Sequence, residues 1–293
     1  MADAPAKQTV LVQLDVDAQP SVFDGVVAVD SGVAHLFRHG GVTPETVRDL
    51  VHGAIFTRGP SDLRSTAIFV GGSDFAKAEA VLGAVKASFF GPFRVSVLFD
   101  PNGSNTTAAA AVLAAIEGLG GTVEGVRVAV LGGTGPVGGR VARLLSGLGA
   151  HVAIGSRDRM KAEAAAGRIS IQSSRGVDAF ASSDPTSLAK GLEGAAVVVA
   201  AGAAGVTLLP ESIRASIPEI RVLIDLNAVP PVGIEGVEPT DKGKGRGGVT
   251  AWGAIGVGAT KMKVHRAAIR ALFATGDRVI DAEDALAIGR SFA

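Results

Sequence analysis

Short apolar runs rich in valine and isoleucine alternate along this chain with longer alanine-rich segments whose apolar residues recur at helical spacing. This alternation predicts an α/β fold, in which helices cover the faces of a parallel sheet. In the first part of the chain, the pattern predicts strands at 10–14, 67–71 and 94–99. It also predicts a helix that Asp74 caps and that continues to about residue 89.

A cluster of glycines at 120–125 interrupts this pattern, and the second part of the chain begins after it. Its first elements are predicted at 126–131, 136–148 and 151–154 and form a βαβ unit. The later predicted elements are strands at 196–201 and 221–225, a helix that Pro210 opens between them, and helices at 258–273 and 282–289. We predict a Rossmann-type, doubly wound parallel sheet over 123–267, and a smaller, discontinuous α/β domain over 1–122 plus about 268–293.

Composition excludes several classes of function. The chain has 293 residues, of which 47% are hydrophobic, and its 28 basic residues balance its 28 acidic ones. There is therefore no overall field to attract nucleic acid or an anionic membrane. The absence of cysteine excludes disulfides and thiolate chemistry, and the absence of tyrosine excludes the Tyr-Lys catalysis of short-chain dehydrogenases. The amino end is polar and no apolar run approaches about 20 residues, so we expect a soluble, cytoplasmic protein.

A glycine-rich loop lies between the predicted strand at 126–131 and the helix that follows. Its GxGxxG spacing is typical of dinucleotide binding, because the glycines permit a tight turn, close approach of a pyrophosphate, and packing of helix on strand. The amides and dipole at the start of the helix would face the anion. A glycine-rich turn without a ligand is the alternative. The predicted cofactor-binding residues are Gly133, Thr134, Gly135, Pro136, Val137 and Gly138, with Ala201 and Asn227 at the ends of later strands.

The end of the second strand of the βαβ unit bears on the choice between NAD and NADP. An acidic residue here would bind a free ribose 2′-hydroxyl, but the chain has Ser156 and Arg157. A hydroxyl and a guanidinium suit a 2′-phosphate, which favours NADP over NAD. Asp158 lies close by and weakens this argument, and a solvated charged loop is the alternative interpretation.

Other polar clusters are candidates for a substrate site. Gln13, Asp15 and Asp17 alternate along a strand end and are expected on one face, either to bind a polar substrate ring or as exposed edge residues. Lys261 is the favoured active-site base or electrostatic group, with a solvated helix face as the alternative. His35 and His39 could share a helix face, but no acidic motif adjoins them, so we predict no metal. Polar residues before an alanine-rich helix are expected either to cap it or to line a pocket: Ser104, Asn105, Thr106 and Thr107.

Several segments together carry a family resemblance that extends nearly end to end. They are QLDVDAQPSVFD (13–24), TAIFVGG (66–72), FFGPFRVSVLFDPNGSNTTAAA (89–110), LGGTGPVGGR (131–140), DLNAVPPVGIEGVEPTDKGK (225–244) and GATKMKVHRAAI (258–269). This chain resembles the bacterial NADP-dependent methylene-tetrahydromethanopterin dehydrogenases, enzymes of one-carbon metabolism of which some also take methylene-tetrahydrofolate. FFGPFRV and SNTTAAA are more specific to this family than the glycine loop is.

The resemblance implies oxidation of 5,10-methylene-tetrahydromethanopterin to the methenyl form by direct hydride transfer to NADP, with the substrate in the cleft between the domains. Lys261 matches the family's active-site lysine, and Thr107 matches a threonine beside the reacting centre. Asp15, Asp17 or Asp24 could favour the positive charge that develops on the substrate. A cationic Lys261 would oppose that charge, so positioning the pterin or acting as a neutral amine are its expected roles.

Three alternatives remain open at this point. They are a methylene-tetrahydrofolate dehydrogenase, a shikimate-type NADP dehydrogenase, and a non-catalytic NADP-binding sensor. The expected partner is a small pterin, with neither nucleic acid nor membrane, and we expect a homo-oligomer.

Overall fold

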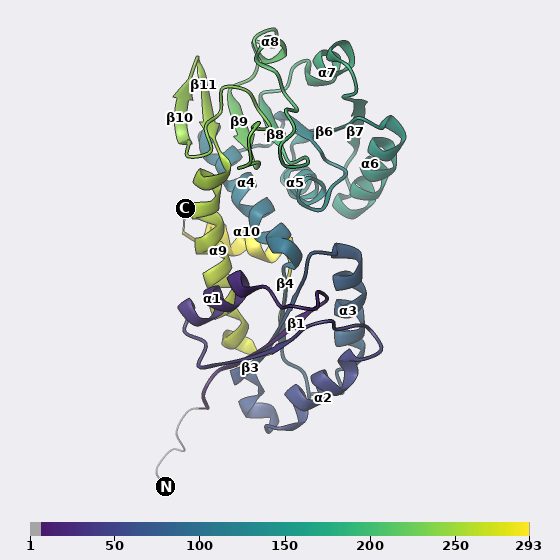
Figure 1. The fold of residues 1–293 in the computed structure, drawn as a ribbon, viewed down its shortest axis with the longest axis vertical. Helices are drawn as coiled ribbons and strands as arrows, with labels where there is room; N and C mark the ends of the chain where they lie inside the picture. Colours follow the sequence, from purple (N-terminus) through teal and green to yellow (C-terminus); the bar gives the residue numbers. More distant parts are fainter. Residues whose placement is uncertain (1–6, 293) are drawn as a thin grey trace. The chain divides into compact units, whose positions relative to one another are not determined.

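The computed structural model describes residues 7–292, which form two compact units (Figure 1). Unit 1 comprises the chain up to Thr106 together with Met262–Ile288, and unit 2 comprises Thr107–Lys261 and the residues after Ile288. The chain passes from one unit to the other inside three helices, α4 (Ser104–Gly118), α9 (Ala254–Thr275) and α10 (Ala282–Arg290). The boundaries of the units thus lie within helices, whereas composition suggested 122/123 and 267/268. Which ligand each unit binds remains a prediction.

Unit 1 is built on a five-stranded sheet in which every pair of neighbouring strands is parallel. The strand order is β12-β4-β3-β1-β2. The chain goes from β1 to its neighbour β2 on one side and then crosses to β3 on the other side of β1. The carboxyl ends of β1 and β3 therefore form a topological switch point, where α/β sheets bind ligands. The strands are β1 (Val10–Asp15), β2 (His35–His39), β3 (Thr66–Gly71), β4 (Ser96–Phe99) and β12 (Val279–Ile280).

Helices cover both faces of the unit 1 sheet because side chains alternate between the faces along each strand. Val12 and Leu14 pack against α2 (Val47–Phe56) and α3 (Phe75–Ala87). Leu11 points to the other face, where α1 (Val22–Asp30) and the later part of α9 cover it. Asp74 caps α3 as predicted, since its carboxylate accepts the N–H of Lys77 at 3.1 Å. The remaining elements are η1 (Pro60–Ser65), η2 (Pro101–Gly103) and α10 (Ala282–Arg290).

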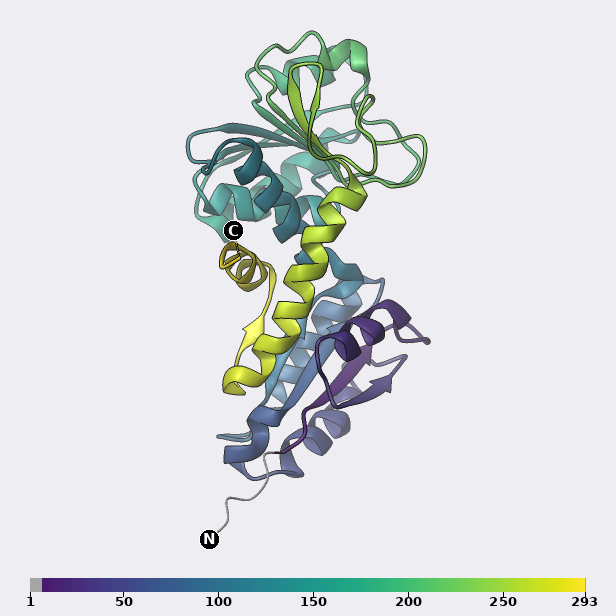
Figure 2. The ribbon, with the colours of Figure 1, turned by 90° about the vertical axis from the view of Figure 1, so that its left-hand side faces the viewer.

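Unit 2 contains a seven-stranded sheet in the order β10-β11-β9-β8-β5-β6-β7. All pairs are parallel except β10 with β11, an antiparallel hairpin at one edge (Figure 2). The chain proceeds from β5 to β6 and β7 on one side and from β8 to β9 and β11 on the other, which is the doubly wound Rossmann arrangement. The predicted fold class is therefore confirmed, and the switch point lies between β5 and β8.

The predicted elements of unit 2 occur in the predicted order, and the structure has further strands and helices between them. Its strands are β5 (Arg127–Leu131), β6 (His151–Ser156), β7 (Val177–Ala181), β8 (Val197–Ala200), β9 (Val222–Asp225), β10 (Lys242–Arg246) and β11 (Val249–Trp252). Its helices, besides parts of α4 and α9, are α5 (Pro136–Gly147), α6 (Arg159–Ser173), α7 (Pro185–Leu192) and α8 (Glu211–Arg214). Within residues 7–292, no helix is both long and apolar enough to cross a bilayer.

Two local expectations were wrong. His35 and His39 do not share a helix face, because residues 35–39 form the edge strand β2, whose mostly exposed polar positions hide its strand character. The segment 241–248, whose basic residues among glycines predict a mobile, solvated loop, contains β10 and the turn into β11. Positive φ angles at Gly243, Gly247 and Gly248 let the chain make this hairpin, so the glycines that suggested mobility serve the turn.

Candidate active site

The turn after β5 forms the first part of the candidate site, at the switch point of unit 2. Gly132 has φ +75°, and a Cβ there would lie 2.6 Å from the backbone N of Gly202, which follows β8. Only glycine fits this position. The tight turn therefore depends on Gly132, not on Gly133 as the motif spacing suggested.

The three glycines of the motif have different surroundings. A Cβ at Gly133 would lie 2.7 Å from the Cβ of Ile154, and a Cβ at Gly138 would lie 2.5 Å from the carbonyl oxygen of Gly132. These two glycines hold α5 close to the sheet. A Cβ at Gly135 would meet nothing nearer than the Gly132 oxygen at 3.5 Å. The protein's own packing thus does not require a glycine at 135, as expected if a ligand occupies the adjacent space.

The amino end of α5 presents unused hydrogen-bond donors. Gly135 is the N-cap and provides no side chain to cap the helix, and Pro136 is the first helical residue. Within residues 7–292, the N–H groups of Val137 and Gly138 have no protein acceptor, and Thr134 beside them is exposed. Free amides and the positive end of the helix dipole suit an anion. The geometry therefore fits the diphosphate of a dinucleotide.

The end of β6 carries the residues expected to distinguish NADP from NAD. Asp158 is the N-cap of α6, and its carboxylate accepts the N–H of Lys161 at 3.1 Å. Ser156 is half-buried and its hydroxyl accepts the N–H of Asp158 at 3.3 Å. Arg157 is exposed and has no hydrogen bond or ion pair in the described part of the chain, whereas Arg159 is paired with Glu163. The acidic residue of this loop is thus engaged in capping, and Arg157 is available.

The other predicted cofactor residues lie at the ends of β8 and β9. Ala201 continues the ladder between β5 and β8, because its N–H donates to Leu131 at 2.9 Å. Asn227 is buried, and its side chain stabilises its own loop: its oxygen accepts from Val229 at 2.9 Å and its nitrogen donates to Pro231 at 3.1 Å. Asn227 therefore shapes the loop after β9.

Asp225, the last residue of β9, was not predicted from the sequence. Its side chain is only 1% exposed, and its carboxylate accepts the N–H groups of Asn227 at 3.0 Å and Ile234 at 2.9 Å. Burial raises the pKa of Asp225, and these hydrogen bonds oppose the shift. An acidic residue that ends a buried apolar strand was the available signal, but its partner nine residues later could not be read from the sequence.

In unit 1, two of the predicted substrate residues share a face of β1. Gln13 and Asp15 are buried, and the Asp15 carboxylate accepts the N–H groups of Asp17 at 3.0 Å and Ser21 at 3.1 Å. Asp17 lies beyond the end of β1, and its carboxylate accepts the N–H and hydroxyl of Ser73, at 2.8 Å and 2.9 Å. The alternation of side chains along a strand therefore does not extend to Asp17. These residues join the loops after β1 and β3 at the switch point of unit 1.

Arg38 on β2 is a further residue that sequence reasoning missed. Its Nε donates to the side-chain oxygen of Gln13 at 2.9 Å, and its Nη2 donates to the carbonyls of Pro20 and Ser21, both at 2.7 Å. It therefore fixes the loop that leads into α1. Asp24 is buried in the first turn of that helix, and its N–H donates to the Ser21 hydroxyl.

The polar segment at the start of α4 is organised by Asp100, another residue not predicted from sequence. Asp100 is fully buried, and one carboxylate oxygen accepts the N–H groups of Asn105 at 2.8 Å and Thr106 at 3.1 Å. The other oxygen accepts the Thr106 hydroxyl at 2.7 Å. The Asn105 side chain donates to the carbonyl of Phe99. Asn105 and Thr106 thus stabilise the start of α4. The buried hydroxyl of Ser104 has no hydrogen-bond partner within residues 7–292.

Lys261 and Thr107 each lie beside a point at which the chain passes from one unit to the other. Both side chains are half-buried, Lys261 on α9 and Thr107 on α4. At the start of α9, Gly253 and Gly256 have no room for a Cβ, because the backbone oxygens of Glu238 and Asp241 lie against them. A glycine-rich run such as 253–258 predicts that a ligand can approach the backbone, but these two glycines pack against 238–241 and so anchor the amino end of the helix that carries Lys261.

The comparisons with known proteins decide the family. Residues 22–102 match the family model described as methylene-tetrahydromethanopterin dehydrogenase, N-terminal. The chain is 33% identical to the NAD(P)-dependent methylenetetrahydromethanopterin dehydrogenase of Methylorubrum extorquens, over 84% of this chain and 85% of that protein. The chain belongs to the methylenetetrahydromethanopterin dehydrogenase family. It is 48% identical to the bifunctional protein MdtA of the same organism, over 97% of this chain and 98% of that protein. The family is one of oxidoreductases, which confirms the resemblance seen in the sequence.

The solved structures confirm the fold of this family member but do not bear on its substrate. Shikimate 5-dehydrogenase from Listeria monocytogenes, solved in complex with shikimate and NAD, aligns with a TM-score of 0.53 over 98% of this chain and 96% of that chain. The two sequences are only 13% identical. Because one fold supports many activities, this likeness establishes architecture alone.

Proposed function

We propose that this chain oxidises 5,10-methylene-tetrahydromethanopterin to 5,10-methenyl-tetrahydromethanopterin, with NADP as the hydride acceptor. The observation that carries the proposal is the family relationship, with 33% identity to an enzyme named for this pterin over 84% of the chain. The chain is thus a dehydrogenase of a one-carbon family, and the pterin, the preference for NADP and the residue roles are the parts proposed here.

Unit 2 has the groups that would hold the dinucleotide. The free amides of Val137 and Gly138, with the open space beside Gly135, fit a diphosphate at the start of α5. Bound there, NADP would supply a nicotinamide ring that accepts a hydride. Ala201 lies across the switch point from the glycine loop, and Asn227 would keep the loop after β9 in shape.

Arg157 supports a preference for NADP. An acidic residue in this loop would favour NAD only if its carboxylate could reach the ribose, and that of Asp158 caps α6 instead. The Arg157 guanidinium has no protein partner among residues 7–292 and can donate a planar pair of hydrogen bonds to a 2′-phosphate. The Ser156 hydroxyl lies beside it in the same loop.

The reaction itself demands little acid–base chemistry from the protein. A hydride, with both electrons of the C–H bond, leaves the methylene carbon between two nitrogens, and the resulting cation is delocalised over the N–C–N group. No proton leaves in that step, so the protein contributes orientation and electrostatics. Asp24 is the carboxylate proposed to favour the developing positive charge. Lys261 and Thr107 are proposed to position the reacting part of the pterin.

The remaining substrate residues of the proposal belong to unit 1. Gln13, Asp15 and Asp17 hold the loops after β1 and β3 in place, so they are proposed as positioning residues at the switch point. Ser104 is proposed to contact the pterin, because its buried hydroxyl has no partner in the described chain. Asn105 and Thr106 support it through the helix start that they stabilise.

Purified protein mixed with NADP and one candidate substrate at a time tests this function. Appearance of NADPH absorbance with methylene-tetrahydromethanopterin is the expected result. Turnover only with methylene-tetrahydrofolate would transfer the same chemistry to the other pterin, and turnover only with shikimate would overturn the proposal. Binding of NADP without turnover of any substrate would identify a sensor. The composition without cysteine supports a cytoplasmic setting, and light scattering would test the proposed homo-oligomer.

A further inference from the structure

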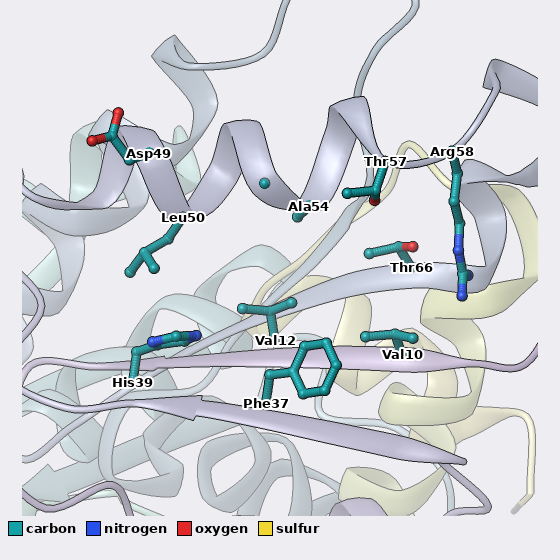
Figure 3. A pocket seen from close by; sticks show the side chains of 11 residues that line it. Val10, Val12, Phe37, His39, Asp49, Leu50, Ala54, Thr57, Arg58 and Thr66 are labelled. Carbon is teal, nitrogen blue, oxygen red and sulfur yellow. The ribbon is translucent and has the colours of Figure 1, made fainter.

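A cavity lies in unit 1, away from the loops of the proposed active site. It has a volume of about 520 Å³ and lies between α2 and the face of the sheet formed by β1, β2 and β3 (Figure 3). This volume is within the range of pockets that bind small organic molecules. The function proposed above assigns no role to it.

The walls of this cavity are apolar along most of its length. Leu50 and Ala54 reach into it from α2, and Val10, Val12 and Phe37 face them from β1 and β2 (Figure 3). The Phe37 side chain is 54% exposed, which is unfavourable for an aromatic ring on a strand. A ligand with an apolar body would cover that ring and fill the gap between helix and sheet.

The two ends of the cavity differ in charge. Arg58 lies at one end, just after α2, and Asp49 lies at the other, near the start of the helix, with His39 below it (Figure 3). Nη2 of Arg58 donates to the carbonyl of Gln8 at 2.9 Å. Its Nη1 is buried and has no hydrogen-bond partner among residues 7–292. A buried guanidinium N–H without an acceptor is costly to the folded protein, and an anionic acceptor is the group that satisfies it best.

We propose that this cavity binds a small amphipathic monocarboxylate, with the carboxylate on Arg58 and the apolar body between Leu50, Val12 and Phe37. Asp49 at the far end disfavours a second negative charge there, so a dicarboxylate does not fit. The carboxylate would meet the guanidinium of Arg58 where that side chain lines the cavity. The site is independent of the dinucleotide and of the pterin.

Calorimetry on the full chain, with octanoate, 2-naphthoate and octan-1-ol as probes, tests this proposal. We expect saturable binding of at least one carboxylate, whichever body it carries, and much weaker binding of the alcohol. Arg58→Gln should weaken binding about tenfold or more, because it removes a charge-assisted hydrogen bond. Ala54→Phe should abolish binding by filling the cavity. Arg48→Gln is the matched control, since Arg48 is an exposed arginine of α2 that does not line the cavity.

Several results would overturn the assignment. These are failure of both carboxylates to bind more tightly than about 1 mM, equal binding of octan-1-ol, or unchanged carboxylate affinity in Arg58→Gln. A change in oligomeric mass for Arg58→Gln, with Arg48→Gln unaffected, would instead identify this face as a contact between copies of the chain. Thermal unfolding would establish that each variant is folded. The heat of binding does not depend on dehydrogenase turnover, so this test and that of the proposed function fail independently.

Discussion

Replacing Gly135 by alanine should separate nucleotide binding from folding. The added Cβ would lie 3.5 Å from the Gly132 oxygen and 4.0 Å from the Ala201 oxygen, which are ordinary contacts. The backbone at 135 has φ −80° and ψ 169°, which alanine adopts freely. Alanine is a poorer N-cap than glycine, which destabilises the folded protein, but it also restricts the unfolded chain, which favours folding. These two effects nearly cancel, so the free energy of unfolding should change by less than about 1 kcal/mol.

The same methyl group should interfere with the nucleotide. It would occupy the space through which a diphosphate reaches the amides of Val137 and Gly138. We therefore expect the dissociation constant for NADP to rise at least about tenfold, which corresponds to about 1.4 kcal/mol of binding free energy. Calorimetric titration with NADP, alongside urea denaturation, measures the two quantities separately.

Two neighbouring glycines provide matched controls. Gly138→Ala places its Cβ 2.5 Å from the Gly132 oxygen, so it should lower the free energy of unfolding by about 1–3 kcal/mol and weaken NADP binding as well. In Gly139→Ala, the added Cβ would lie 3.4 Å from the Gly133 oxygen, and the residue lies inside α5. This change should therefore stabilise the protein by about 0.5–1 kcal/mol and leave NADP binding unchanged. Wild-type affinity for NADP in Gly135→Ala would refute the proposed diphosphate site.

Four further changes probe the other parts of the molecule. Arg157→Ala should raise the KM for NADP about tenfold or more but that for NAD by far less, since only NADP carries the 2′-phosphate; equal changes would count against the idea. Lys261→Ala should reduce kcat at least about tenfold with NADP affinity retained, and unchanged turnover would return this residue to a solvated helix face. Asp100→Ala should lower the free energy of unfolding by about 2–5 kcal/mol in urea denaturation, because two buried N–H groups lose their acceptor; a loss under about 1 kcal/mol would disprove this role. Burial raises the pKa of Asp225 above 3.8, so the contribution of this carboxyl group to stability is fully present below pH 3.8 and is lost as the pH rises through the pKa of the folded state. The difference in free energy of unfolding between wild type and Asp225→Asn should therefore change with pH across this range, and a pH-independent difference would exclude the raised pKa.

The alternation of apolar runs and helical segments was sufficient to predict the class of both sheets and most of their strands. Five strands were not predicted. Four of them, β2, β7, β10 and β12, lie at the edges of their sheets, and the fifth, β11, has only four residues. Edge strands bury little side-chain surface, so their sequences are under weak constraint from packing.

Some residues of the candidate site could likewise be predicted from the sequence, and others could not. The glycine loop could be found in the sequence because its residues are adjacent and because Gly132, Gly133 and Gly138 have no room for a side chain. Arg38 could not, since its partners Gln13 and Ser21 are 25 and 17 residues away in the sequence. The role of Asp158 was ambiguous for a different reason: a carboxylate after a strand can bind a ribose or cap the next helix, and only coordinates show which hydrogen bond forms.

What the sequence by itself determined is therefore the α/β class, the position of the glycine-rich loop after β5 and the family, because periodicity and short motifs report local backbone geometry. Tertiary structure alone decided that Gly132 makes the tight turn, that Asp100 and Asp225 serve as buried acceptors, and that a cavity opens under α2. Each of these depends on atoms brought together from separate elements, where burial makes every unmatched donor costly and so dictates which side chains must meet.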